Sequence, residues 1–143
     1  MNFFTAMEVI SSGLTAERVR MNITASNLAN TETTRTDAGG PYRRRDPIFA
    51  ATNLEEGRGF QTDLDQALQG VEVVEVVEDT KAPRLIFEPG HPDANPDGYV
   101  ELPNVNMVEE MVNMMMAARS YEAGVSAMRS VTEMAQRALS VGR

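Results

Sequence analysis

A short acidic stretch in the second half of the chain comes nearest to a chemical site. Asp93, Asn95 and Asp97 alternate and a glycine follows, as in the first half of an EF-hand loop, whose side-chain oxygens bind calcium. The twelfth position of such a loop needs a bidentate Glu, and here it is Asn104. Two prolines also interrupt the stretch. We therefore expect an Asx/Gly turn, and we keep a calcium-responsive binding module at 89–104 as the alternative function.

Residues suited to catalysis are few. His91 is the only histidine and lies between prolines, without a nucleophile elbow or a phosphate-binding glycine loop elsewhere in the chain. The chain has no Cys, which excludes disulfides and thiolate metal sites. We expect His91 to be a turn residue, and we expect no enzymatic activity, no cofactor and no metal centre.

The run Arg43, Arg44 and Arg45 is a basic island in an acidic region, and it has two interpretations. Arginines at a strand edge prevent indiscriminate pairing with other strands. The same run also suits docking to an acidic neighbour, such as the middle of another copy. The sequence leaves both interpretations open.

Charge is distributed unevenly along the 143 residues, whose formal net charge is −8. Residues 1–30 and 105–143 are each neutral overall, whereas 31–104 hold fifteen acidic and seven basic residues. Neutral ends can pack beside copies of themselves, while an acidic middle stays solvated. Nucleic acid is not an expected partner.

The C-terminal segment, 105–143, has the clearest periodicity. Alternate steps of four and three residues from Met107 give a heptad seam with one polar member, typical of a long packed helix. Asn106 is the predicted N-cap. A helix of this length, roughly 50 Å at 1.5 Å per residue, is too long for so small a domain to cover. The seam consists of Met107, Met111, Met114, Ala118, Tyr121, Val125, Met128, Thr132, Ala135 and Leu139.

The N-terminal segment, 1–30, has a weaker stripe of the same kind. Glu17 and Thr24 interrupt it, and Gly13 costs about 1 kcal/mol relative to Ala in a helix. We expect a marginal helix that pairs with the C-terminal helix in an antiparallel, coiled-coil-like hairpin. The stripe consists of Phe3, Met7, Ile10, Leu14, Met21, Ala25 and Leu28.

The middle segment, 31–104, is predicted to be loops and a small β-rich unit, so the fold class is α+β. β-Branched residues at 71–77 predict a strand that turns at 79–83 into a second strand. Residues 53–70 remain unassigned between a mobile loop and a short helix. The remaining expected elements are a loop at 31–46 and strands at 84–87 and 98–102.

No cleavable signal and no membrane span are visible in the sequence, so by the ordinary signals we expect a soluble, cytoplasmic protein unless another export route operates. A membrane-active helical protein is a third hypothesis. Neither terminal segment has the strongly basic polar face of an interfacial helix, which disfavours it.

Several motifs nevertheless resemble one family. Residues 22–31, with Ser12-Gly13-Leu14 and Arg18 before them, resemble the N-terminal signature of bacterial flagellar axial proteins, which are the rod, hook and hook-associated subunits. Residues 39–44, 91–100, 103–106, 110–112 and 118–123 resemble the proximal rod subunits among them. The family usually has Asn after Tyr-Glu-Ala, whereas this chain has Gly124.

This resemblance implies a structural subunit of the basal-body rod. Such subunits leave the cell through the flagellar type III apparatus without a cleaved signal and assemble helically in the periplasmic space. Their terminal helices surround the export channel, and the array transmits torque. The implied partners are copies of the chain, other rod proteins, the inner-membrane ring and the export gate. The predicted assembly interface is Leu14, Met21, Asn27, Leu28, Asn30, Arg43, Arg44, Arg45 and, from the C-terminal seam, Met107, Met111, Met114, Ala118, Tyr121, Val125, Met128 and Leu139.

Overall fold

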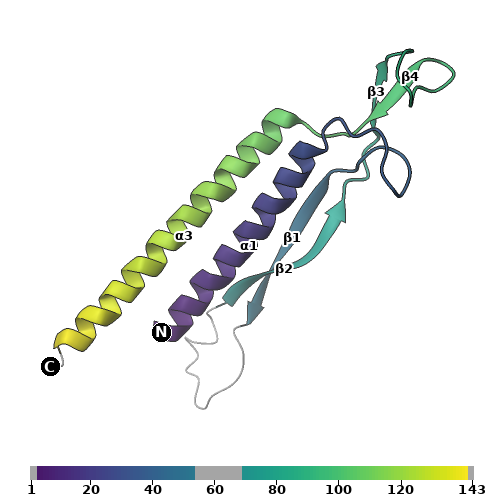
Figure 1. Cartoon of the computed structure of the whole chain (residues 1–143). Helices are drawn as coiled ribbons and strands as arrows, with labels where there is room; N and C mark the ends of the chain where they lie inside the picture. The colour runs from purple at the N-terminus through teal and green to yellow at the C-terminus, as the bar shows by residue number, and fades with distance from the viewer. Residues whose placement is uncertain (1–2, 54–68, 142–143) are drawn as a thin grey trace.

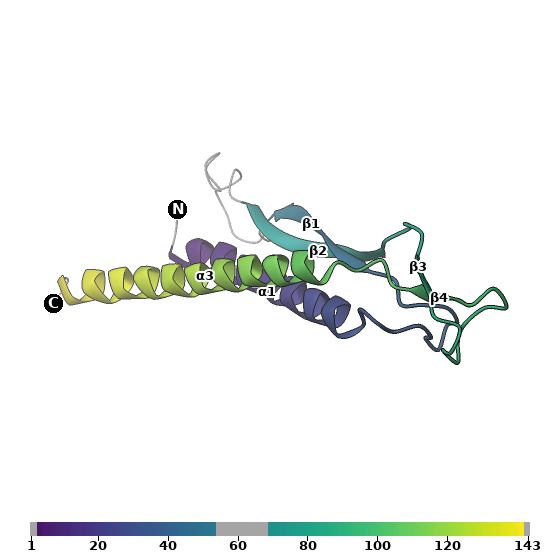
Figure 2. The same ribbon diagram turned by 90° about the horizontal axis from the view of Figure 1, so that it is seen from above.

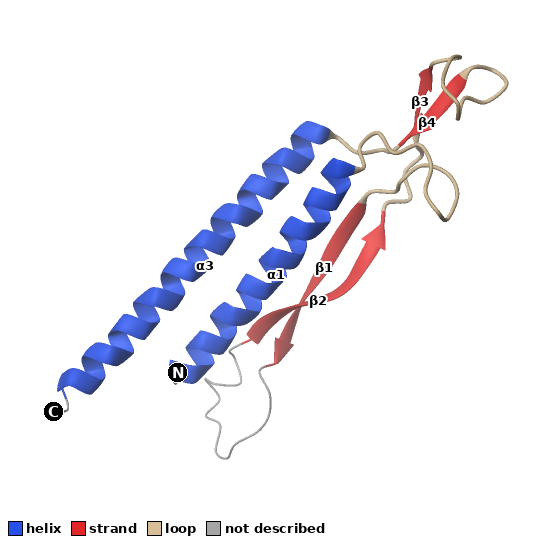
Figure 3. Cartoon of the chain, viewed as in Figure 1, coloured by secondary structure: helices blue, strands red, loops and turns tan. Residues whose placement is uncertain are grey.

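Two long antiparallel helices dominate the structure, a computed structural model that describes residues 3–53 and 69–141. They lie side by side, with one two-stranded sheet along the first helix and another beyond the helix ends (Figures 1 and 2). The predicted α+β class is confirmed (Figure 3). The described residues form α1 (Phe3–Ala29), β1 (Arg45–Asn53), β2 (Gln69–Glu78), β3 (Arg84–Phe87), β4 (Tyr99–Leu102) and α3 (Met107–Val141).

Helix α3 begins at the predicted cap. The Asn106 Oδ1 accepts hydrogen bonds from the backbone N–H groups of Val108 at 3.1 Å and Glu109 at 3.4 Å, which satisfies donors that the first turn leaves unpaired. The helix has 35 residues and α1 has 27, which corresponds to roughly 52 and 40 Å. The C-terminal end of α3 therefore extends past α1 (Figure 1).

Helix α1 is covered on two sides, by α3 and by the β1–β2 sheet. The Ser12 hydroxyl accepts a hydrogen bond from the backbone N–H of Val71 in β2 at 3.1 Å and donates to the Val9 carbonyl at 2.8 Å. Thr24, which interrupts the apolar stripe, is buried. Polar residues that weaken α1 as an isolated helix thus make contacts within the folded chain.

The strand pairing differs from the sequence-based prediction. Strand β2 pairs with β1 in antiparallel register, from Arg45 opposite Glu78 to Asn53 opposite Gln69, with an irregularity between Ile48 and Phe49. The predicted pairing of 71–77 with 84–87 is wrong, because β3 pairs with β4 instead. Residues 79–83 link the two sheets. Most of the unassigned segment 53–70 lies outside the described residues.

The core is small for a chain of this length. The buried apolar residues of the described part include Ala16, Tyr42, Val100, Pro103, Val105 and Ala117. The accessible surface is 10373 Å², compared with roughly 7300 Å² for a compact monomer of the same mass. Several large apolar side chains of the described residues are exposed, among them Val108 at 69%, Met115 at 58% and Leu139 at 76%, so the chain's own residues leave part of its apolar surface without cover.

Candidate functional site

The side-chain amide of Asn27 is the centre of a buried polar junction, which we define as Asn27, Tyr42, Arg44 and Glu110. Its Oδ1 accepts hydrogen bonds from the Arg45 backbone N–H and from the Tyr42 hydroxyl, both at 2.9 Å. Its Nδ2 donates to the Arg45 carbonyl at 2.8 Å and to Glu110 Oε2 at 3.1 Å. These bonds use the full capacity of the amide, so one side chain joins α1, β1 and α3.

An ion pair completes the junction. Glu110 is only 1% exposed, and its Oε1 accepts a hydrogen bond from Arg44 Nε at 2.7 Å. Arg44 also pairs with Asp46. Burial by itself lowers the pKa of the Arg44 guanidinium, but hydrogen bonds and charge from Asp46 and Glu110 outweigh it and raise that pKa. The guanidinium therefore stays charged at any working pH, and the buried carboxylate of Glu110 always faces a cation.

Residues of the same N-terminal motif close the last turn of α1. Thr31 Oγ1 donates to the Leu28 carbonyl at 2.7 Å, and Asn30 Nδ2 donates to the Ser26 carbonyl at 2.8 Å. The same two carbonyls also accept backbone N–H groups, Ser26 from Asn30 at 3.1 Å and Leu28 from Thr31 at 3.4 Å, so side chains reinforce the bonds that end the helix. The motif therefore both ends α1 and holds the chain that follows it.

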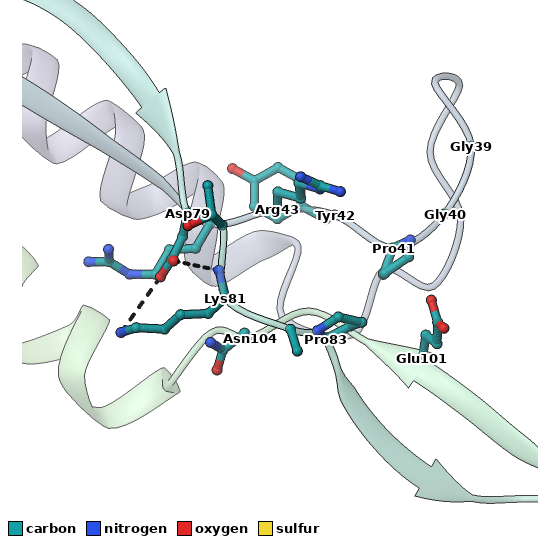
Figure 4. A pocket seen from close by; sticks show the side chains of 13 residues that line it. Gly39, Gly40, Pro41, Tyr42, Arg43, Asp79, Lys81, Pro83, Glu101 and Asn104 are labelled. Atoms are coloured by element: carbon teal, nitrogen blue, oxygen red, sulfur yellow. Dashed lines mark hydrogen bonds and ion pairs between the residues drawn. The ribbon is translucent and has the colours of Figure 1, made fainter.

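The three consecutive arginines occupy different environments. Arg44 belongs to the junction, whereas Arg45 pairs with Glu78 across the β1–β2 sheet at 3.1 Å. Arg43 is exposed at the edge of a pocket between the loop around Gly40 and residues 79–83 (Figure 4). A docking role for Arg43 stays a prediction.

Helix α1 also contacts α3 at two further places. Arg18 Nη2 donates to the Tyr121 hydroxyl at 3.4 Å. Near the middle of α3, a Cβ added at Gly124 would lie 2.8 Å from Leu14 Cδ2 and 3.3 Å from its Cγ. The missing side chain at Gly124 therefore lets Leu14 approach the backbone of α3 closely.

The line of α3 that faces α1 overlaps the predicted heptad seam only in part. Glu110 and Ala117, which are buried, lie outside that seam, whereas Met107, Met111 and Leu139 within it are exposed. A search for apolar spacing passes over Glu110 because a carboxylate is expected in solvent. Here the junction compensates for its burial.

The predicted interface residues fall into three groups, and their role in assembly stays a prediction. Asn27 is buried, and Arg43, Arg45, Met107, Met111 and Leu139 are exposed. The half-buried members are Leu14, Met21, Leu28, Asn30, Arg44, Met114, Ala118, Tyr121, Val125 and Met128.

Two glycines give a matched test of the helix packing. A Cβ at Gly13 meets nothing within 4 Å, whereas one at Gly124 meets Leu14. We expect Gly13→Ala to raise the free energy of unfolding by about 0.5–1 kcal/mol through helix propensity. Gly124→Ala should gain less, because Leu14 must move. Urea unfolding of both variants measures the difference, and an equal or larger gain for Gly124→Ala would contradict the close contact.

An apolar surface remains uncovered on α3. Val108 is 69% exposed and Met115 is 58% exposed. We define the outer face of α3 as five exposed apolar residues of its first three turns, a helix face without cover in this chain. They are Val108, Met111, Val112, Met115 and Met116.

The acidic stretch forms a turn, and the calcium alternative has no support. Asn95 Oδ1 accepts hydrogen bonds from the backbone N–H groups of Asp97 and Tyr99 at 3.1 and 2.8 Å. Asp93 Oδ2 accepts one from the Thr34 hydroxyl at 2.8 Å. His91 lies in the preceding turn, where its Nδ1 accepts the Asp93 N–H at 3.1 Å. In residues 3–53 and 69–141, no group of three or more acidic, His or Cys side chains is placed to hold a metal.

Neither the burial of Tyr42 nor the internal role of Glu110 was predicted from the sequence. Glu110 lies in the first turn of α3, where an acidic residue also favours the helix dipole. One signal was available, because Glu110 lies four, seven and eleven residues before Met114, Ala117 and Tyr121. That spacing puts the carboxylate on the face that packs against α1.

Two protein-family models match this chain, and the matches cover most of its terminal helices. Residues 7–35 match the family model described as "Flagella basal body rod protein", and residues 97–141 match "Flagellar basal body rod FlgEFG protein C-terminal". Neither α1 nor α3, the helices of the described part, is both long and apolar enough to cross a membrane.

Full-length relatives extend the similarity to the middle of the chain. The flagellar basal-body rod protein FlgC of Borreliella burgdorferi is 44% identical over 99% of this chain and 98% of its own length. FlgC of Bacillus subtilis is 38% identical over the whole of both chains. FlgC of Aquifex aeolicus is 38% identical over 96% of this chain and 95% of its own.

Proposed function

The chain belongs to the FlgC family of flagellar basal-body rod proteins, and on this premise we propose that α1 and α3 build the helical wall of the rod around the export channel. As a member of this family it is a structural subunit of the rod.

The observation that carries this proposal is the uncovered apolar outer face of α3. Five apolar side chains of the first three turns of α3 are 45–69% exposed and have no cover from the described part of the chain. Surfaces of this kind mark contacts with other proteins. Contacts between unlike faces of identical chains generate an open helical array rather than a closed ring.

The junction supports a mechanical role for the subunit. It links both helices to β1 through buried, directional hydrogen bonds, and packed cores and such networks transmit strain. We propose that torque passes from the helices to the middle segment through this junction. The role is structural and contains no catalytic step.

Its proposed setting is the periplasmic part of the basal body, reached through the flagellar export apparatus without a cleaved signal. Besides other rod subunits, the proposed neighbours are the inner-membrane ring and the export gate. A coiled-coil-like fit of α1 and α3 is also part of the proposal, with helix packing that becomes complete on assembly.

Deletion of the gene in the bacterium that carries it tests the family function. We expect cells without flagellar filaments and basal bodies without a rod, since the missing subunit interrupts a sequential assembly. Electron microscopy of purified basal bodies and swimming in soft agar are the measurements. Plasmid-borne wild-type chain should restore both, and a deletion strain with normal flagella would contradict the proposal.

A further inference from the structure

A groove runs beside α1, between α3 and the β1–β2 sheet. We define it by Ile10, Gly13, Leu14, Glu17, Phe49 and Gly124, which line it. Its walls are mainly apolar, and two of the six positions are glycines. Gly13 has nothing within 4 Å of where a Cβ would lie, so the groove is open at this position.

One charged group in this groove lacks a hydrogen-bond partner. The Glu17 Oε2 is shielded from solvent and accepts no hydrogen bond. Arg20 of the same helix also lines the groove, and its Nη1 lies 4.0 Å from Glu17 Oε2, too far for a hydrogen bond. A buried carboxylate oxygen without a hydrogen bond lowers the stability of the fold. A hydrogen-bond donor from a partner chain would remove this penalty.

The C-terminal end of α3, residues 133–141, has the complementary pattern; we call it the α3 extension. It runs beyond α1, and Met134 and Val141 are 63% and 86% exposed. Met134, Arg137, Ala138 and Val141 follow the spacing i, i+3, i+4 and i+7, which places them on one helix face. That face is apolar with a single cation, and helices that bind in grooves are anchored at such positions.

Charge and length agree between the two surfaces. Within the described residues, Arg137 pairs with Glu133 of its own helix at 3.9 Å, and both side chains are largely exposed, so little free energy holds that pair. Residues 10–20 of α1 span roughly 15 Å and the α3 extension roughly 12 Å at 1.5 Å per residue. The extension therefore fits the groove in length, in apolar pattern and in the sign of its one cation.

We propose that the groove receives the α3 extension of a second copy of this chain, with Arg137 of that copy bound to Glu17. The inference rests on the proposed rod function and specifies one of its contacts. It is a head-to-tail contact between unlike surfaces, so each copy has a free extension and a free groove with which to continue the array.

Cysteine cross-linking tests the contact, because the natural chain has no Cys. Full-length chain with Gly13→Cys and Ala138→Cys is produced in the deletion strain, oxidised in cells and recovered in purified basal bodies. We expect a ladder of dimers and longer multimers on non-reducing gels. A bond within one chain is excluded, because residue 138 lies about 20 Å along α3 from Gly124, which packs near Gly13, far beyond the reach of a disulfide.

Control variants and an exchange of charges test whether the cross-link reports the contact between the groove and the α3 extension. Gly13→Cys with Glu101→Cys on β4 should give no ladder, and neither should either cysteine of the test pair alone. Glu17→Arg and Arg137→Glu should each reduce swimming at least threefold, and their combination should restore it. Normal rods that contain the chain but give no ladder, and no restoration by the exchange, would overturn the groove contact and leave the rod function standing. Loss of the chain from the rod would overturn both.

Discussion

Glu110→Ala should lower the free energy of unfolding of the isolated subunit by about 3 kcal/mol, in the range measured when one member of a buried ion pair is removed. The variant leaves the Arg44 guanidinium, which is 16% exposed, without its buried partner. It also leaves one amide hydrogen of Asn27 unsatisfied, and each loss adds a desolvation penalty. Urea unfolding followed by circular dichroism measures the change.

Two control variants show whether the loss of stability in Glu110→Ala comes from the junction or from a general effect on α3. Glu109→Ala removes an exposed carboxylate from the same turn and should change stability by no more than about 0.5 kcal/mol. Glu110→Leu combined with Arg44→Met removes both charges and should recover most of the loss, as apolar replacements of buried pairs often do. A Glu110→Ala subunit as stable as Glu109→Ala would show that the junction contributes little to folding.

Val108→Asp combined with Met115→Asp should abolish rod assembly while the subunit still folds. Both side chains are exposed in the free subunit, so the substitutions leave its core unchanged. In the rod, each would lose about 1.5–3 kcal/mol of apolar burial and place a carboxylate in an apolar contact. The combined loss corresponds to a weakening of at least about 100-fold. Swimming and rod content of purified basal bodies measure the effect.

The matched variant is Val108→Leu with Met115→Leu, which keeps the outer face of α3 apolar and should assemble. Circular dichroism of the Asp variant should match that of the wild-type subunit, which excludes misfolding as the cause. Normal rods built from the Asp variant would mean that this face stays in solvent and that the assembly contacts lie elsewhere.

Local signals predicted the helices well. Asn106 marks the start of α3 because its side chain caps the first turn, and the apolar spacing that follows requires a helix. The strands at 84–87 and 98–102 were also predicted, since β-branched and aromatic residues cluster there.

Pairings between distant segments were much harder to predict. Strand β1 includes Pro47 and two alanines and has no clear alternation, so only its partner β2 identifies it as a strand. The junction depends on Asn27 and Glu110 meeting 83 positions apart in sequence. Asn27 and Glu110 are each typical of an exposed helix end. No local sequence pattern predicts that the two side chains meet.

At Gly124 the family resemblance and the structure give complementary information. The family resemblance identifies it as a departure from the usual Asn, and the structure gives the consequence, which is the approach of Leu14 to α3. The polar residues of α1 are explained by contacts that only the folded chain makes. Ser12 and Asn27 contact the β1–β2 sheet, so residues that weaken the helix locally stabilise it through the folded chain.

An electron cryo-microscopy map of basal bodies purified from the native bacterium tests the central claim most directly. We predict that the chain is found in the rod, with α1 and α3 along the wall of the export channel and the outer face of α3 covered by neighbouring subunits. A map that places the chain outside the rod, or that leaves Val108 and Met115 facing solvent, would contradict this account.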